Sequence, residues 1–285
     1  MPNLTDLSTI RDLCERYDFA LSKGFGQNFI VNPGVCPKII EAAGIDKDCG
    51  VLEIGPGIGV LTKELAHAAK KVVAVEVDER LPPMLAETLD GCDNVKIVLN
   101  DVLKTDLRQL IADEFAGMRV VVCANLPYYI TSPILMKLLE ERLPIDNITV
   151  LVQKEAAERL ASAPGTRTAG AVSYAVAYYA NARLMFNVQP GSFYPAPKVV
   201  STVIRLDVRR DATVSVEDEP GYFKLVRAAF CQRRKTAANS IAAGLQLPKD
   251  KVLAALRAGG FDERIRPEKL TLEDFAKIQA LLKEA

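Results

Sequence analysis

The segment from Asn125 to Tyr128 combines residue types that could hold an aromatic amine. The Asn125 side-chain oxygen can accept a hydrogen bond, and Tyr128 offers a ring face on which a flipped base can stack. The Leu126 carbonyl is a second acceptor, because the following proline interrupts strand pairing at this point. Acceptors on both N–H groups of an adenine amine would localise the nitrogen lone pair. This Asn-Leu-Pro-Tyr tetrad therefore predicts methylation of an exocyclic adenine amine, with the released proton going to water.

A glycine-rich turn, Glu53 to Gly59, follows a predicted strand over residues 51–54. Glycines let the backbone approach a ligand closely, and the next helix offers unpaired amides. The spacing G-x-G-x-G, preceded by an acid, differs from the G-x-G-x-x-G of dinucleotide-binding enzymes. It therefore disfavours a nicotinamide-dependent dehydrogenase. It favours a cofactor whose charged end is an amino acid, with Gly55 beside it.

Two further acids lie at the ends of the next predicted strands. Glu76 follows the glycine turn by about 20 residues, where a carboxylate can accept from both ribose hydroxyls of a nucleoside. Asp101 ends the next strand and can accept from an adenine amine. A single acid at a strand end is often only a cap or turn former. Three such features on successive strands predict one nucleoside-cofactor site, on the same sheet edge as the tetrad.

Short β-branched runs alternate with helical stretches from residue 51 to about 153. Strands rich in Val, Ile and Leu, separated by helices, predict an α/β fold with a doubly wound, mostly parallel sheet. We expect a Rossmann-like domain over residues 1–210, which includes a helix at 169–180. Beyond residue 211 the β pattern stops. Short helices there predict a small all-helical domain over 211–285.

The composition argues against several kinds of site. The chain has 285 residues, 36 basic and 36 acidic side chains and one histidine, His67, on a predicted helix surface. Its six cysteines are scattered without a zinc-binding spacing, so we expect neither a metal nor histidine-based catalysis. The apolar runs fall far short of the roughly 20 residues of a membrane span, and no signal-peptide pattern is present. We expect a cytoplasmic protein without a membrane partner.

The chain closely resembles the ribosomal RNA adenine dimethyltransferases over nearly its whole length, and in particular their bacterial small-subunit branch. The matching segments are the two sites above and residues 22–30, 193–199, 229–236 and 266–270. The resemblance implies S-adenosylmethionine as the methyl donor and an N-terminal segment that closes on it. It also implies dimethylation of two adjacent adenosines near the 3′ end of 16S (small-subunit) ribosomal RNA, within the immature small ribosomal subunit.

The resemblance also implies roles for individual residues. Those implied to contact or line the cofactor pocket are Asn28, Ile30, Gly55, Glu76, Asp101 and Asn125. Phe193 would close on the target adenine opposite Tyr128. The basic segment Arg233, Arg234 and Lys235 would bind RNA phosphates, which position a nucleic acid while base contacts specify it.

Two alternatives share part of this pattern. An Erm-type enzyme, which methylates an adenine of 23S (large-subunit) ribosomal RNA and confers antibiotic resistance, carries the same tetrad. The basic motif at 233–235 and the long helical tail favour the small-subunit branch. The other alternative is a ribosome-assembly binding factor whose methylation is secondary. No interface stripe in the sequence demands a dimer, so we expect a monomer.

Overall fold

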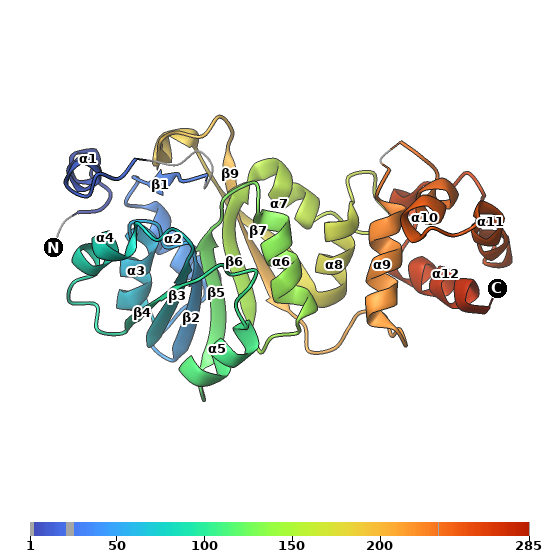
Figure 1. The fold of residues 1–285 in the computed structure, drawn as a ribbon, viewed down its shortest axis with the longest axis horizontal. Coiled ribbons are helices and arrows are strands. Elements are labelled where there is room, and N and C mark those ends of the chain that lie inside the picture. Colours follow the sequence, from blue (N-terminus) through green and yellow to red (C-terminus); the bar gives the residue numbers. More distant parts are fainter. Residues whose placement is uncertain (1–2, 21–25, 233, 285) are drawn as a thin grey trace. The chain divides into compact units, whose positions relative to one another are not determined.

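The computed structural model describes residues 3–20, 26–232 and 234–284 (Figure 1). The chain divides into two compact units. The first contains the chain up to residue 157 together with residues 182–208, and the second contains residues 158–181 together with the chain from residue 209 onward. The sequence pattern placed residues 158–181, with their helix, in the first domain. The structure instead groups them with the C-terminal helices.

A seven-stranded sheet forms the centre of the first unit, in the order β4-β3-β2-β5-β6-β9-β7. The first five strands of this order are parallel, and β9 pairs antiparallel with β6. Their bounds are β2 Cys49–Ile54, β3 Lys71–Glu76, β4 Val95–Leu99, β5 Arg119–Asn125, β6 Asn147–Gln153, β7 Ala180–Val188 and β9 Ser201–Val208. The predicted Rossmann-like fold is confirmed. Continuous apolar runs fit the inner strands because both of their faces are covered.

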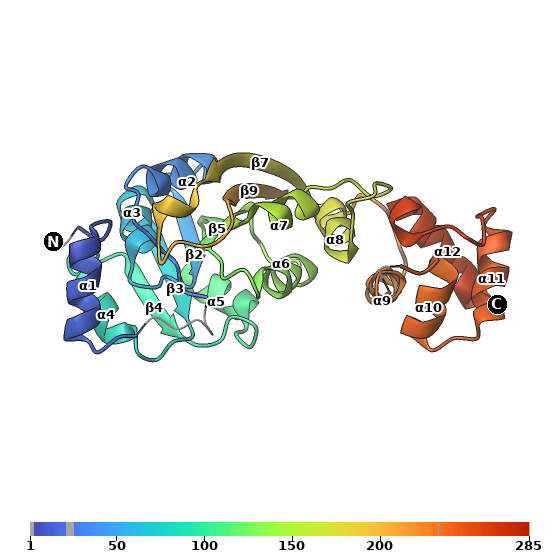
Figure 2. The ribbon, with the colours of Figure 1, turned by 90° about the horizontal axis from the view of Figure 1, so that it is seen from above.

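Helices cover both faces of this sheet. Figure 2 shows α2 (Val35–Ala43) and α3 (Val60–Ala68) on one face, and α5 (Leu107–Glu114) and α6 (Thr131–Glu140) on the other. The first face buries Ile39 and Leu65 in one apolar cluster with Val51 of β2. His67 is exposed on α3, as predicted. The first unit also contains α1 (Leu7–Arg16) and α4 (Pro82–Thr88), and α7 (Lys154–Leu160) begins in the first unit and ends in the second.

A second, two-stranded sheet joins distant parts of the first unit. Strand β1 (Phe29–Ile30) pairs antiparallel with β8 (Phe193–Tyr194), and Ile30 lies opposite Phe193. This pairing was not predicted. It connects the N-terminal segment to the loop between β7 and β9.

The second unit is helical. It contains α8 (Ala171–Tyr179), α9 (Glu219–Ala229), α10 (Ala237–Leu245), α11 (Lys249–Ala258) and α12 (Leu272–Glu284). The aromatic face of α8 explains why this helix belongs here. The Tyr178 and Tyr179 rings lie 5.0 and 5.2 Å from the Phe223 ring of α9, and both hydroxyls bond to Glu219. Among the described helices of the chain, none combines the length and the apolar character that a membrane crossing requires.

Candidate cofactor and base-binding site

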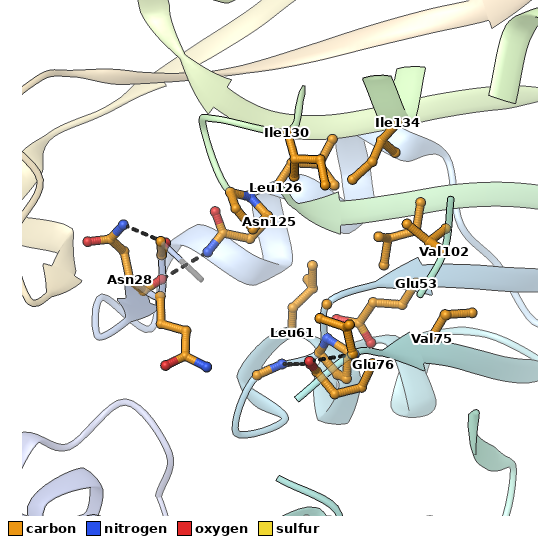
Figure 3. A pocket seen from close by; sticks show the side chains of 18 of the residues that line it. Asn28, Glu53, Leu61, Val75, Glu76, Val102, Asn125, Leu126, Ile130 and Ile134 are labelled. Atoms are coloured by element: carbon orange, nitrogen blue, oxygen red, sulfur yellow. Dashed lines mark hydrogen bonds between the residues drawn. The ribbon is translucent and has the colours of Figure 1, made fainter. Parts of the chain in front are cut away.

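A pocket opens at the carboxyl ends of β2, β3, β4 and β5 (Figure 3). The six residues expected at the cofactor all line it: Asn28, Ile30, Gly55, Glu76, Asp101 and Asn125. Leu126 and Tyr128 of the tetrad line it as well. The sheet brings these residues together because parallel strands end at the same edge.

The glycine turn forms one wall of the pocket. The Gly55 amide donates to the Val75 carbonyl at 2.9 Å, which ties the turn to β3. Gly57 has a φ of +58°, and a Cβ there would lie 3.1 Å from the Phe29 ring. The turn therefore needs glycine at 57 both for its backbone conformation and for its contact with β1.

Glu76 holds the end of β3 against this turn. Its side chain accepts from the amides of Val77 and Asp78, each at 2.8 Å, and from the Gly57 amide at 3.4 Å. The residue is 5% exposed, and this burial raises its pKa while the backbone amides oppose the shift. A carboxylate has about four lone-pair sites, so Glu76 retains the capacity to accept from a ligand hydroxyl.

Asp101 has a turn-forming role in addition to its place in the pocket. Its Oδ1 accepts from the Leu103 amide at 2.9 Å, and its Oδ2 lies 3.8 Å from the Lys104 ammonium. Asp101 therefore does stabilise a turn, as a single acid at a strand end often does. This does not exclude the other role, because the same side chain lines the pocket.

Glu53 is a pocket residue that the sequence did not single out, although the acid before the glycines was its signal. The side chain is 1% exposed and lies close to the glycine turn (Figure 3). Its Oε2 has no hydrogen-bond partner within the described parts of the chain. Burial raises the pKa of Glu53 to about 8; the Thr62 hydroxyl opposes this shift, and the nearby Glu76 carboxylate adds to it. A carboxyl with one buried oxygen that has no partner favours its protonated form.

Asn125, at the end of β5, is fixed by the N-terminal segment. Its Nδ2 donates to the Asn28 carbonyl at 3.0 Å, and the Asn28 side chain in turn donates to the Gly26 carbonyl at 3.0 Å (Figure 3). With its nitrogen engaged in this way, Asn125 keeps its Oδ1 as an acceptor for a ligand. The next residue, Leu126, is 1% exposed, and its amide donates to the Leu151 carbonyl at 3.1 Å.

Two tyrosines follow in the tetrad loop. Tyr128 is half-buried, its hydroxyl lies 2.7 Å from the Ser201 hydroxyl, and burial raises its pKa. Tyr129 was not predicted as a site residue, yet it lines the pocket and is 61% exposed. Its only signal in the sequence is its position beside Tyr128.

Phe193 lies differently from the expectation. It is 4% exposed and belongs to the apolar cluster of the first unit. It is not one of the residues that line the pocket, and its connection to the site is the backbone pairing with Ile30. The apolar ring is retained in the core, where its burial removes the most surface from water.

The basic segment belongs to the second unit. Arg233 lies outside the described residues. Arg234 and Lys235 are exposed between α9 and α10, and the Arg234 carbonyl accepts from Arg266 at 3.4 Å. Their side chains are thus available to a ligand in solution. Across the described residues, no group of three or more His, Cys, Asp or Glu side chains is arranged to hold a metal ion.

The family model of ribosomal RNA adenine dimethylase matches residues 19–284. This chain belongs to the ribosomal RNA adenine dimethylase family. Among its relatives, a ribosomal RNA small subunit methyltransferase A of Geobacillus thermodenitrificans is 50% identical over 95% of this chain and 94% of the relative. The protein of the same name in Lachnoclostridium phytofermentans is 48% identical over 100% of this chain and 99% of the relative.

Two solved structures of methyl-transferring enzymes share the fold. A dimethyladenosine transferase of Plasmodium falciparum is 27% identical, with a TM-score of 0.71, over 90% of this chain and 97% of that one. The 23S rRNA methyltransferase ErmE is 25% identical, with a TM-score of 0.61, over 90% of this chain and 99% of that one. The Erm-type alternative is thus less similar to this chain than the small-subunit methyltransferases are.

Proposed function

We propose that this chain uses S-adenosylmethionine to dimethylate the exocyclic amines of two adjacent adenosines near the 3′ end of 16S ribosomal RNA. The observation that carries the proposal is the Asn125 side chain, whose Oδ1 stays available at a pocket lined by Glu76 and Asp101. The names of relatives that are 48–50% identical over nearly the whole chain support the small subunit as the target.

The pocket residues fit a cationic nucleoside with an amino-acid end. Glu53 offers a buried carboxyl oxygen without a partner in the described residues, and a Cβ built on Gly55 would meet nothing within 4 Å, which leaves room beside the turn. We propose that Glu76 accepts from the ribose hydroxyls and Asp101 from the adenine amine. Asn28 and Ile30 would cover the cofactor from the N-terminal segment, with Gly55 beside its amino-acid end.

At the target, this chain's own groups would orient the amine. When bound, S-adenosylmethionine supplies an electrophilic methyl group on a sulfonium. The Asn125 Oδ1 and the Leu126 carbonyl accept from the two N–H groups of the adenine, which localises the nitrogen lone pair toward that methyl. Tyr128 stacks on the base. As the new N–C bond forms and the S–C bond breaks, one N–H proton is released to water, so no side chain needs to act as a strong base.

Other parts of the chain would position the RNA. We propose that Arg233, Arg234 and Lys235 contact phosphates, with a monomer acting in the cytoplasm on the immature small subunit. We also keep Phe193 as a contact of the target base. That contact requires the ring to turn out of the apolar cluster in which it is buried.

The test is methylation of ribosomal subunits that lack the modification. Immature small subunits and large subunits are incubated with the protein and labelled S-adenosylmethionine, and the RNA is analysed by mass spectrometry. Two adjacent dimethyladenosines in 16S RNA are expected. Label in 23S RNA alone would transfer the function to the Erm type. An Asn125→Ala variant that retains full activity would refute the role of the tetrad.

The same variant addresses the assembly-factor alternative. If the chain acts chiefly by binding, a strain that carries only Asn125→Ala should assemble small subunits as the wild type does. If methylation is the main function, that strain should show the same assembly defect as a strain without the gene. Binding of the variant to immature subunits, measured by sedimentation, shows whether binding is intact.

A further inference from the structure

The Tyr128 side chain is held at its far end by a residue of another strand. Its hydroxyl oxygen lies 2.7 Å from Oγ of Ser201, the first residue of β9. Either hydroxyl can donate, and this is the hydrogen bond that the structure shows for each of them. A phenol is fixed in direction when its ring packs at one end and its hydroxyl bonds at the other.

Ser201 is itself rigidly placed. It is fully buried, with 0% exposure, and its backbone lies opposite Gln153 in the β6–β9 ladder. Its neighbour Val200 accepts from the Lys154 amide at 3.0 Å, which continues the pairing beyond the strand. The serine hydroxyl therefore reaches Tyr128 from the sheet itself, and a side chain on a strand holds a geometry more precisely than one on a loop.

The hydrogen bond between Tyr128 and Ser201 joins a pocket residue to a residue outside the pocket. Tyr128 lines the pocket, whereas Ser201 does not. The loop that carries Tyr128 is anchored to β6 on its other side, through the Leu126 amide and the Leu151 carbonyl. Burial raises the pKa of Tyr128 and the Ser201 hydrogen bond opposes this shift, so the phenol is neutral in this bond.

We infer that Ser201 is a positioning residue for the base-stacking face of Tyr128. This inference rests on the proposed function, in which Tyr128 stacks on the target adenine. Ser201 touches neither the cofactor nor the RNA in this scheme. It sets the tilt of the ring, and thereby the angle at which the adenine amine is presented to the methyl group.

The experiment is a double-mutant cycle with Ser201→Ala and Tyr128→Phe, assayed by single-turnover methylation of immature small subunits. Loss of one oriented hydrogen bond is expected to slow methyl transfer by about 5- to 10-fold in each single variant. The double variant should be no slower than either single one, because each substitution removes the same bond. Cofactor affinity, measured by calorimetry, should stay within twofold of the wild type.

A matched control is Thr202→Val, on the next residue of the same strand. Thr202 is also buried, and its hydroxyl donates to Asn187 at 2.8 Å instead of to the tetrad. This variant loses a comparable buried hydrogen bond and should keep the wild-type rate. Equal slowing in Thr202→Val and Ser201→Ala would assign the effect to general strand damage and overturn the inference.

Other outcomes are equally decisive. If Ser201→Ala slows transfer further in the Tyr128→Phe background, Ser201 acts by another route and the inference is wrong. If Ser201→Ala leaves the rate unchanged while Asn125→Ala abolishes it, the inference fails and the proposed function stands. If Asn125→Ala is fully active, the proposed role of the tetrad is wrong, and the inference about Ser201 is wrong with it. Tyr128→Phe leaves β9 intact. If Ser201→Ala folds poorly, the methyl-transfer rate of Tyr128→Phe therefore still tests whether the hydrogen bond matters.

Discussion

The Asn125 side chain donates through Nδ2 to the backbone carbonyl of Asn28 at 3.0 Å. This contact joins the tetrad at the end of β5 to the segment that precedes β1. It sets the orientation of the Asn125 amide, because the nitrogen faces the chain and the oxygen remains for a ligand. The two halves of the proposed reaction, cofactor closure and base orientation, therefore share one side chain.

Asn125→Asp tests whether the side-chain nitrogen and oxygen of Asn125 have these separate roles. Aspartate keeps an acceptor for the adenine amine but replaces the donor to Asn28 with a second oxygen, which the carbonyl repels. We expect at least a tenfold weaker affinity for S-adenosylmethionine, by calorimetry, together with slower methyl transfer. Asn94→Asp is the control, since Asn94, in the loop before β4, donates to the backbone carbonyls of Ala66 and Ala69 at the end of α3 and does not line the pocket. Wild-type cofactor affinity in Asn125→Asp would contradict the coupling.

Glu53 should make cofactor binding depend on pH. Burial raises the pKa of this carboxyl to about 8, so it is largely protonated below that pH before the cofactor binds. The cofactor carries a net positive charge and favours the ionised form, so binding should release a proton. Affinity should therefore rise with pH, by up to about tenfold per unit below pH 8.

Calorimetry in two buffers with different ionisation enthalpies measures that proton directly. Glu53→Gln removes the titrating group and should bind with no proton release attributable to this site. The other groups near Glu53 that titrate in this region of the sheet are Glu76, Cys36 and Cys123. Because burial raises the pKa of both thiols well above this pH range, proton release of the same size in wild type and Glu53→Gln would assign it to Glu76 instead.

The same shift predicts a change in stability with the opposite dependence on pH. The folded protein binds this proton more tightly than the unfolded chain, whose glutamate titrates near 4.5. The contribution of Glu53 to stability is therefore fully present below about pH 4.5 and is lost as the pH rises through about 8. Urea unfolding should show that the free energy of unfolding falls less from pH 6 to pH 9 in Glu53→Gln than in the wild type. An equal fall in the free energy of unfolding in both proteins would exclude this coupling between Glu53 protonation and stability.

Gly57→Ala should weaken cofactor binding for a steric reason. The position has a φ of +58°, and the new Cβ would lie 3.1 Å from the Phe29 ring. A left-handed conformation costs an alanine roughly 1–2 kcal/mol. Gly117→Ala is a matched control, because Gly117 has a φ of +75° with open space around the new Cβ. Both variants should lose stability in thermal unfolding, and only Gly57→Ala should lose cofactor affinity.

Replacement of Arg234 and Lys235 by alanine should weaken RNA binding without affecting the cofactor. Both side chains are exposed, and each phosphate contact contributes about 0.7–0.9 to the slope of log K against log salt concentration. Filter binding across a salt series should therefore give a shallower slope for the double variant. Lys38→Ala with Lys70→Ala removes the same charge from exposed positions on the first unit and should leave the slope unchanged. Identical slopes in both double variants and the wild type would reject the phosphate contacts.

Much of this protein could be predicted from its sequence alone, because its decisive signals are local. Apolar runs separated by helices define the parallel sheet, and parallel strands must end at one edge. Gly55, Glu76, Asp101 and Asn125 each end a strand or follow one within two residues, so their meeting in one pocket follows from the fold class. Their exact partners do not.

Only the tertiary structure decided which distant side chains meet. The tyrosines of α8 pack on Phe223, which moves that helix to the C-terminal unit although it lies between strands of the sheet in sequence. Phe193 is buried opposite Ile30, and Ser201 reaches Tyr128, across long separations in the chain. Periodicity reports which face of an element is apolar, but it does not report the element that covers that face. Packing between elements settles this, and here it decided how the predicted tetrad is held.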